Sequence, residues 1–578
     1  MLEYYADPES GAWAEVGYQP FPLGEPRPSA PVPAPPLVGL SALRDAYDFV
    51  IVGSGAGGGV AACVLAEAGA SVLVVERGRW LGHDDIVVDH LRNHRFAVHG
   101  DSTSPEGHPR AVDAPDGGER AIEPSDPDYQ HNAITAGGGT RVFGAQAWRF
   151  LPDDFRMATI YGVPEGSALA DWPISYDDLA PYYDRVEWEL GVAGTAGHRV
   201  EGPRTRGYPM PPFPPSPEAV RLAAAARDLG WATAPVPLLV NTRERHGRNA
   251  CVRCGFCVGF ACPVDAKNGT FSTVLPRAVA AGATVVCETQ AVSVGDDGNV
   301  ILRGGEVERT VCAGRVVLAG GAVETARLLL VSRIGNDWVG RCLQGHTYAG
   351  AFGRFDDVVI DGLGPGPSIA TRDFSHGNDG IVGGGLLANE FIKLPALFYA
   401  WALPRGAPRT GSAGRAAMAE AYLRTGHVMG PIQEIPTRAA RVGLAAHVRD
   451  AVGMPVARFE GLQHAEDRNT AAFLAGRAEQ WMQAAGAREA WQAPMSPPAV
   501  SGGQHQAGTA RMASSADAGA TDPFGRVWGT ERVYVADGSL HVTNGGANPV
   551  LTILALAWRT AEHLARGDQP GPASGGPL

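Results

Sequence analysis

The segment Gly53-Ser54-Gly55-Ala56-Gly57-Gly58 has the spacing G-x-G-x-x-G, which is typical of a loop that binds a dinucleotide. In such a loop the first glycine permits a tight turn, the second lets the backbone approach a pyrophosphate, and the third lets the next helix pack closely on the strand. Glu76 stands 18 residues after Gly58, where an acidic residue is expected to bind a ribose hydroxyl. That acid favours FAD or NAD over NADP, because the 2′-phosphate of NADP needs a basic partner.

The residues around these glycines are expected to form a strand, a turn, a helix and a second strand. Tyr47–Val52 and Ser71–Val75 are short apolar runs, as in buried parallel strands, and the segment VAACVLAEAG between them has helical spacing. Similar strands are predicted at Arg315–Ala319, before another glycine turn, and at Arg532–Ala536. The parallel sheet of one nucleotide-binding domain is therefore expected to draw on segments spread over the whole chain.

The composition excludes several classes of protein. The chain has 578 residues, 45% of them hydrophobic, and a formal net charge of −13. A chain of this kind buries a large core, and its acidic balance argues against nucleic-acid binding, which needs a basic surface. The sequence contains no apolar run of about 18 residues, so no membrane span is predicted. The N-terminus also lacks the basic and apolar regions of a secretory signal, so a cytoplasmic protein is expected.

Four further features, taken with the glycine fingerprint, resemble the glucose-methanol-choline (GMC) family of flavoproteins. They are the glycine loop Gly137–Ala145, the segment Asp171–Val192, the strand and helix Arg315–Leu330, and a C-terminal pair, His505–Thr509 (HQAGT) with Gly545–Leu564 (GGANPVLTILALAWRTAEHL). The matching segments extend from about Tyr47 to Leu564. The resemblance implies FAD as the cofactor and an α/β fold, in which a Rossmann-like FAD-binding domain is interleaved with an antiparallel-sheet substrate domain.

The chain is expected to divide into discontinuous units. We assign residues 46–170, 255–345 and 500–566 to the FAD-binding domain, and residues 171–254 and 346–499 to the substrate-binding domain. Residues 1–45 contain the stretch PRPSAPVPAPP and are expected to form a proline-rich extended arm. Residues 567–578 are expected to form a flexible tail.

The resemblance also implies which residues bind FAD. These are Gly53, Ser54, Gly55, Ala56, Gly57, Gly58, Glu76, Arg77, Gly137, Gly138, Gly139, Thr140, Phe143, Gly144, Ala145, Val292, Asp537, Gly538, Asn548, Pro549 and Val550. Relatives that attach their flavin covalently use a histidine of the flavin loop. No histidine occurs within residues 137–148, so the resemblance implies that FAD is bound non-covalently.

The resemblance places His505 and Asn548 in the catalytic roles. Oxidation of an alcohol removes a hydride from carbon and a proton from the hydroxyl, and imidazole, which ordinarily titrates near about pH 6.5, suits the proton. His505 would be this base, and the Asn548 amide would hold the substrate oxygen. Asn548 is also predicted to cap a helix that begins at Pro549. His346 and His541 are interpreted as structural or flavin-proximal rather than catalytic.

Four of the eight cysteines form the cluster Cys251-x2-Cys254-x2-Cys257-x4-Cys262. The spacing resembles an iron–sulfur ligand set, but such sets place three residues before the last cysteine. Zinc sites usually separate their C-x2-C pairs more widely. We favour structural thiols or a local disulfide over an iron–sulfur cluster or zinc.

The expected reaction is the FAD-dependent oxidation of an alcohol, namely the primary hydroxyl of a sugar, pseudo-saccharide or aminoglycoside from antibiotic biosynthesis. Gln433, Glu434 and Trp148 are candidates for lining the substrate pocket, and Trp401 is another ring that could stack on a sugar. Oxygen or a separate acceptor would take the electrons. Two alternatives are an iron–sulfur-linked sugar dehydrogenase and a lyase of the same fold with a redox-silent flavin.

Overall fold

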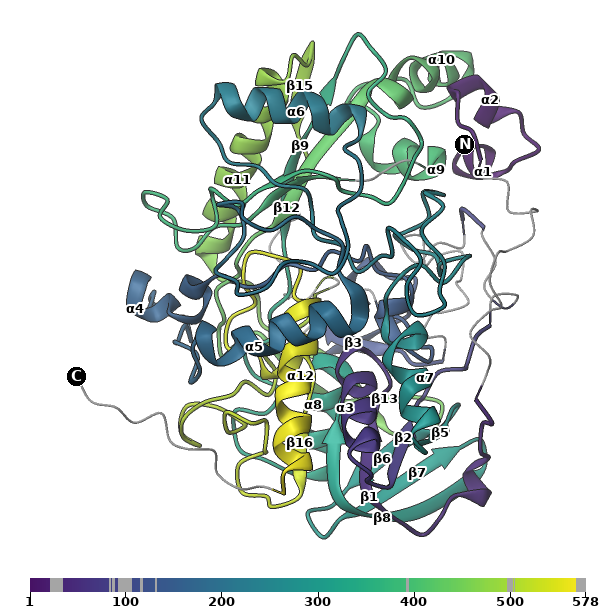
Figure 1. Ribbon diagram of the computed structural model, residues 1–578, viewed down its shortest axis with the longest axis vertical. Coiled ribbons are helices and arrows are strands. Elements are labelled where there is room, and N and C mark those ends of the chain that lie inside the picture. The colour runs from purple at the N-terminus through teal and green to yellow at the C-terminus, as the bar shows by residue number, and fades with distance from the viewer. Residues whose placement is uncertain are drawn as a thin grey trace.

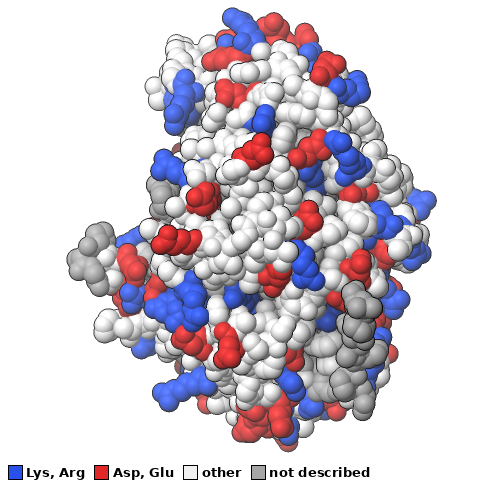
Figure 2. Space-filling view, turned by 90° about the vertical axis from the view of Figure 1, so that its left-hand side faces the viewer, with Lys and Arg blue, Asp and Glu red and all other residues white. Residues whose placement is uncertain are grey.

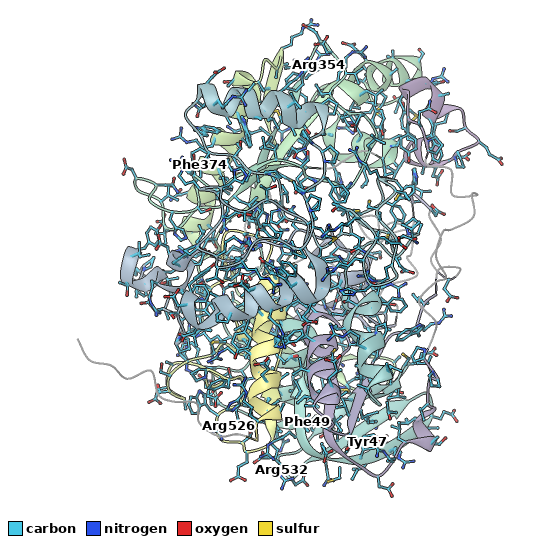
Figure 3. All side chains as sticks on the ribbon, in the orientation of Figure 1. Tyr47, Phe49, Arg354, Phe374, Arg526 and Arg532 are labelled. Atoms are coloured by element: carbon cyan, nitrogen blue, oxygen red, sulfur yellow. The ribbon has the colours of Figure 1, made fainter. Side chains whose placement is uncertain are left out.

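The computed structural model describes residues 1–20, 35–82, 85, 89–91, 107–114, 118–129, 132–390, 394–495, 503 and 505–567. The strands in these residues form three sheets, and the expected α/β class is confirmed (Figure 1). The two larger sheets lie at opposite ends of the molecule. Figure 3 makes this visible, because Tyr47 and Phe49 lie near the bottom of the view and Arg354 near its top.

The seven-stranded sheet, at the bottom of Figure 1, is the nucleotide-binding sheet that the sequence predicts. Its parallel strands include all four predicted ones and are β5 (Thr284–Val286), β2 (Val72–Val75), β1 (Ala46–Val52), β8 (Val307–Leu318) and β16 (Val533–Val535). An antiparallel hairpin, β6 (Gln290–Val294) and β7 (Asn299–Gly304), extends the sheet from β8.

Apolar helices pack around this sheet and bury it, as a parallel sheet requires. They are α3 (Ala56–Glu67), α7 (Val274–Ala280), α8 (Gly321–Ser332) and α12 (Val550–Ala565). Helices α3 and α12 lie side by side although almost 500 residues separate them in the chain (Figure 1). Helix α5 (Tyr176–Val186) packs against α12, so a segment that we assigned to the substrate domain contacts the nucleotide-binding unit.

The five-stranded sheet, at the top of Figure 1, is antiparallel as expected for the substrate domain. Its strands are β10 (Ala370–Thr371), β11 (Leu387–Asn389), β12 (Thr425–Pro431), β9 (Tyr348–Arg354) and β15 (Glu489–Gln492). The long helix α11 (Ala465–Ala484) packs on this sheet and on α6 (Pro217–Asp228). The short helix α4 (Met157–Tyr161) precedes α5.

A four-stranded sheet joins distant parts of the chain. It consists of β13 (Arg441–Arg449), β14 (Pro455–Glu460), β3 (Arg110–Asp113) and β4 (Glu119–Ile122). The first two strands come from a segment assigned to the substrate domain and the last two from one assigned to the FAD domain. The proposed domain boundaries therefore cross a hydrogen-bonded sheet.

The N-terminal arm is helical at its beginning rather than extended. Helices α1 (Leu2–Ala6) and α2 (Ala12–Val16) share an apolar cluster with α9 (Pro395–Leu397) and α10 (Gly411–Ala421), because Tyr5 and other apolar side chains are buried there. Residues 21–34, which hold most of the proline-rich stretch, and 568–578 of the predicted tail lie outside the described residues.

No helix among the described residues is long and apolar enough to cross a membrane. On the face shown in Figure 2, acidic and basic side chains are mixed, and neither sign dominates a broad area.

Candidate active site

A cavity of about 1020 Å³ lies at the carboxyl ends of β1, β2, β8 and β16 and extends to the five-stranded sheet. Ligands of open α/β sheets bind at this edge. At one end the cavity is lined by the turn after β1 together with Glu76 and Arg77. At the other end it is lined by Tyr348, Phe352, Trp401 and Trp491.

The turn after β1 requires glycine because other backbone lies against it. A Cβ atom on Gly57 would lie 1.6 Å from the carbonyl oxygen of Ala536, and one on Gly58 would lie 1.9 Å from that of Gly53. Helix α3 can therefore begin beside β16 and direct its free N–H groups towards the cavity. Gly58 acts through this packing and does not itself line the cavity.

Glu76 lies at the end of β2 and fixes the same turn. One carboxylate oxygen accepts from the backbone N–H and the hydroxyl of Ser54, at 3.0 and 2.5 Å, and the other accepts from the N–H of Gly78 at 2.7 Å. A carboxylate has about four acceptor sites, so Glu76 can also accept from a ribose hydroxyl. The residue that the sequence assigns to ribose thus also holds the glycine turn.

The predicted flavin loop contacts this turn directly. The N–H of Gly137 donates to the Ser54 hydroxyl at 3.0 Å, and a Cβ on Gly138 would lie 3.0 Å from the Cα of Gly55. The buried Lys267 ammonium lies within hydrogen-bonding distance of four carbonyl oxygens, at 2.6 to 3.3 Å, and shares its three hydrogens among those of Arg141, Phe143, Cys257 and Phe260. Lys267 therefore joins the flavin loop to the loop that holds the four clustered cysteines.

Most of the residues predicted to bind FAD line the cavity. They are Gly53, Ser54, Gly55, Ala56, Gly57, Glu76, Arg77, Gly138, Gly139, Thr140, Phe143, Gly144, Ala145, Asp537, Gly538, Asn548, Pro549 and Val550. Gly137 and Val292 do not line it, and Thr289, Gln290 and Ala291 line it near Val292 instead. The glycine turn at a helix N-terminus and the acid beyond β2 fit the pyrophosphate and the ribose of a dinucleotide.

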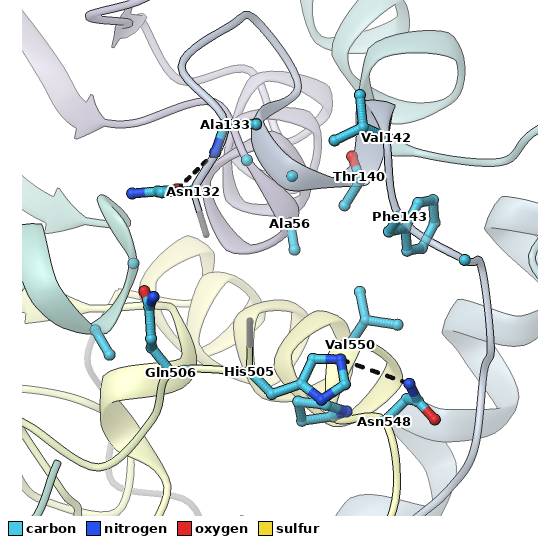
Figure 4. Close-up of a pocket in the computed structure, with 18 of the residues that line it drawn as sticks. Ala56, Asn132, Ala133, Thr140, Val142, Phe143, His505, Gln506, Asn548 and Val550 are labelled. Atoms are coloured by element: carbon cyan, nitrogen blue, oxygen red, sulfur yellow. Dashed lines mark hydrogen bonds between the residues drawn. The ribbon is translucent and has the colours of Figure 1, made fainter. Parts of the chain in front are cut away.

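His505 and Asn548 meet inside this cavity. The Asn548 amide nitrogen lies 3.5 Å from Nε2 of His505 and donates to the Tyr348 hydroxyl at 3.3 Å. The Asn548 carbonyl oxygen is buried and has no hydrogen-bond partner in the described part of the protein. Figure 4 shows this pair across the cavity from Ala56 and Thr140.

The predicted helix cap at Asn548 is wrong. Helix α12 begins at Val550, its N-cap is Pro549, and no side chain caps it. The Asn548 side chain is directed to Tyr348 and His505 instead, so its amide serves the cavity.

His346 is the main residue that the sequence interpretation underestimated. Its Nδ1 lies 2.8 Å from Nδ1 of His505, and its Nε2 lies 2.8 Å from the carbonyl oxygen of Gly545. His541 is linked to His505 through Asn544. Its Nδ1 lies 3.0 Å from the Asn544 side-chain oxygen. The Asn544 amide nitrogen in turn donates to the His505 carbonyl oxygen at 2.7 Å. No motif in the sequence indicates these contacts.

The structure places the three substrate candidates outside the cavity lining. Glu434 is 1% exposed and accepts from the backbone N–H groups of Gly345 and Thr347, at 2.9 and 2.7 Å, so it holds the loop that carries His346. Gln433 is equally buried. The Trp148 indole donates at 3.0 Å to Gln146, which does line the cavity.

Different residues line the substrate end of the cavity. Phe352 stacks on His427 and on Trp491, with ring centroids 4.1 and 5.6 Å apart. Trp401, which is 43% exposed, lines the cavity near them. Among the described residues, the charged ones that line this end are Glu390, Arg405 and Arg409.

The cysteine cluster lies behind the flavin loop. Cys251, Cys254, Cys257 and Cys262 surround a small gap together with Lys267, and all four are free thiols. Burial raises the pKa of Cys254 to about 12, which favours its protonated form. No group of histidine, cysteine or acidic side chains with metal-binding geometry occurs in the described ranges.

Comparison with family models identifies three matching regions. Residues 436–557 and 167–348 match the C-terminal and N-terminal models of the GMC oxidoreductases, and residues 51–99 match an NAD(P)-binding Rossmann-like domain. Among solved structures, pyridoxine 4-oxidase from Mesorbium loti has a TM-score of 0.59 at 17% identity, and the match covers 90% of this chain and 99% of that one. This similarity shows the shared fold.

Curated relatives match along nearly their whole length. The 6'''-hydroxyparomomycin C oxidase of Streptomyces lividus and the paromamine 6'-oxidase of Streptomyces fradiae are each 29% identical, over 90% of this chain and 91% of theirs. The 2-methyl-1,2-propanediol dehydrogenase of Mycolicibacterium austroafricanum is 28% identical, over 91% of this chain and 96% of its own.

The two family models match the segment before β9 and the segment that carries His505 and Asn548, and residues of both segments line the cavity. The family implies FAD as the cofactor. The chain is therefore a member of the GMC oxidoreductase family, an oxidoreductase that acts on CH–OH donors.

Proposed function

We propose that this enzyme oxidises a primary hydroxyl of a carbohydrate-like alcohol (a sugar, pseudo-saccharide or aminoglycoside) to the carbonyl compound, with FAD held non-covalently. The contact between Asn548 and Nε2 of His505, inside the cavity and across from the flavin loop, carries the proposal. It brings a proton acceptor and an amide to one point beside the predicted cofactor site.

Bound FAD supplies the hydride acceptor of the reaction. Nε2 of His505 accepts the hydroxyl proton, and the Asn548 carbonyl oxygen, which has no partner among the described residues, can accept a hydrogen bond from a second donor of the substrate. The hydrogen on the carbinol carbon leaves with its electron pair, and the C–O bond becomes a carbonyl. The N-terminus of α12 faces the cavity at Val550 and favours negative charge there.

The lining of the substrate end supports a carbohydrate-like substrate. Flat aromatic rings at Phe352, Trp401 and Trp491 can cover the C–H face of a sugar. Glu390 offers a carboxylate to an amino group, and Arg405 offers donors to ring hydroxyls. Two of the relatives, the 6'''-hydroxyparomomycin C oxidase and the paromamine 6'-oxidase, bear names that agree with this class.

The test is anaerobic mixing of the flavin-loaded protein with aminoglycosides, neutral sugars, short diols and sterols. We expect the visible absorbance of oxidised flavin to disappear with one of the first two groups. An oxidised spectrum that stays unchanged while product forms would establish the redox-silent lyase instead. Oxygen consumption in air then distinguishes an oxidase from a dehydrogenase.

His505→Ala tests the base. We expect full flavin content and a reduction rate that is lower by about 10²-fold or more, because a positioned general base typically contributes this much. His464→Ala is the matched control, because His464 is a histidine at the N-cap of α11, away from the cavity. Equal reduction rates in the His505 variant and the wild type would contradict the assignment.

A further inference from the structure

The loop before β9 places a second imidazole directly behind His505. Nδ1 of His346 and Nδ1 of His505 lie 2.8 Å apart, and the two rings are nearly perpendicular, at 84°. One hydrogen must lie between these two nitrogens, because two lone pairs or two N–H groups would repel at this distance.

The other side of His346 decides which ring supplies that hydrogen. Nε2 of His346 lies 2.8 Å from the carbonyl oxygen of Gly545 and 3.2 Å from that of Asn544. Carbonyl oxygens only accept, so Nε2 of His346 carries a hydrogen. His346 is 6% exposed, and burial lowers its pKa, so the ring is neutral and its Nδ1 is an acceptor.

The hydrogen between the rings therefore belongs to Nδ1 of His505. A neutral His505 that holds its hydrogen on Nδ1 has a lone pair on Nε2. Nε2 is the atom that the Asn548 amide approaches at 3.5 Å, and an amide N–H requires an acceptor there. The two sets of contacts are independent and give the same tautomer.

We propose that His346 is a positioning residue that fixes the tautomer of His505, so that the Nε2 lone pair faces the cavity and can accept the substrate proton. The proposal rests on His505 acting as the base in the proposed function. After Nε2 takes the proton, the Nδ1–H of the imidazolium keeps its bond to His346, so the contact between the two rings does not rearrange during the transfer.

His346 is itself held rigidly. Glu434 accepts from the backbone N–H groups on both sides of it, at Gly345 and Thr347. The titratable groups that act on His346 are Glu434 and Asp154, which favour its charged form, while His541 interacts with it as a third, buried group. The combined effect of these groups on the pKa of His346 is smaller than the effect of burial, so its Nδ1 remains an acceptor.

Two variants separate the role of the acceptor from the role of the ring. His346→Leu removes the acceptor, and we expect kcat for flavin reduction to fall by about 10²-fold with a small change in KM, because a base in the wrong tautomer cannot take the proton. His346→Asn offers a side-chain oxygen near the position of Nδ1, and we expect it to recover at least tenfold of that loss. His464→Leu is the control for an unrelated histidine.

Nitrogen NMR of protein labelled at the histidine rings reads the tautomer without any turnover. In the wild type the His505 signals, assigned by their absence in His505→Ala, should show hydrogen on Nδ1 and none on Nε2. His346→Leu should move hydrogen to Nε2, and His346→Asn should not. Flavin content and the midpoint of thermal unfolding are measured for each variant, so that a variant that has merely misfolded is recognised.

Hydrogen on Nε2 of His505 in the wild type would overturn the proposal, as would a His346→Leu variant with wild-type kcat. A wild-type rate in His505→Ala would instead overturn the proposed base and leave the measured tautomer standing. The failure of the inference and the failure of the proposed function are therefore distinguishable.

Discussion

At the residue scale, each polar side chain around the reacting point has an orientation imposed by its neighbours. Tyr348 and His505 both engage the amide nitrogen of Asn548, which leaves the amide oxygen as the acceptor without a partner in the described structure. A buried polar atom without a partner costs about 1–3 kcal/mol. An incoming hydroxyl that donates to this oxygen removes the cost.

Asn548→Ala tests this reading. We expect an unchanged flavin content, a raised KM and a kcat for flavin reduction that is lower by about tenfold or more, because a substrate without its positioning hydrogen bond reacts from fewer productive poses. Anaerobic stopped-flow over a range of substrate concentrations separates the two constants. Tyr348→Phe is the matched control, since it removes the other partner of the amide nitrogen and keeps the oxygen. An Asn548→Ala enzyme with wild-type constants would refute the role of the amide.

At the scale of elements, the site depends on how closely α3 approaches β16. The start of α3 can touch the residue that follows β16 only because Gly57 has no side chain, since a Cβ there would lie 1.6 Å from the carbonyl oxygen of Ala536. The flavin loop then rests on the same turn through Gly137 and Ser54. The sequence motif therefore specifies a contact between a helix and a distant strand as well as a ligand cradle.

Gly57→Ala is expected to separate α3 from β16 and to abolish FAD binding, with a loss of stability of more than about 3 kcal/mol, because backbone must move to admit the methyl group. Gly476→Ala in α11 is the control, because a Cβ there meets nothing within 4 Å. The control should gain about 0.4–1 kcal/mol. Chemical denaturation of both variants, with flavin absorbance as a second signal, measures the difference. A Gly57→Ala protein that binds FAD normally would exclude this packing.

At the scale of the whole molecule, the fold buries several histidines in their neutral form. Burial lowers the pKa of His90, His108 and His541 to about 4 in each case. An unfolded histidine titrates near about pH 6.5, so between that pH and about pH 4 the unfolded chain binds protons that the folded chain does not. The stability that these three histidines contribute is therefore complete above about pH 6.5 and falls as the pH decreases through this window.

His541→Gln is expected to reduce that pH dependence. Each buried neutral histidine contributes a slope of up to about 1.4 kcal/mol per pH unit, so the variant should lose stability less steeply than the wild type between about pH 6.5 and pH 4. The exposed His447→Gln should keep the wild-type slope. Urea titrations at several pH values measure both slopes. Identical slopes in the two variants would show that His541 is not held neutral.

The sequence predicts the parts of this protein that depend on short-range spacing. Alternating glycines specify a turn, apolar β-branched runs specify buried strands, and an acid at a fixed distance specifies the end of the next strand, so β1, α3, β2 and the end of β8 follow from the residues themselves. The sequence is a poor guide to which residues line the substrate pocket. Glu434 and Trp148 are residues of suitable chemistry, but both are buried behind the residues that line the cavity.

The sequence by itself determined the nucleotide-binding sheet and the family to which the chain belongs, and it singled out His505 and Asn548 as the candidate pair. The tertiary structure alone decided what surrounds that pair. His346 lies 159 residues from His505 in the chain, and their contact exists because β9 and the C-terminal segment pack at one edge of the cavity. Spacing in a sequence encodes local backbone geometry, whereas the direction of a ring nitrogen depends on partners that only packing brings within hydrogen-bonding distance.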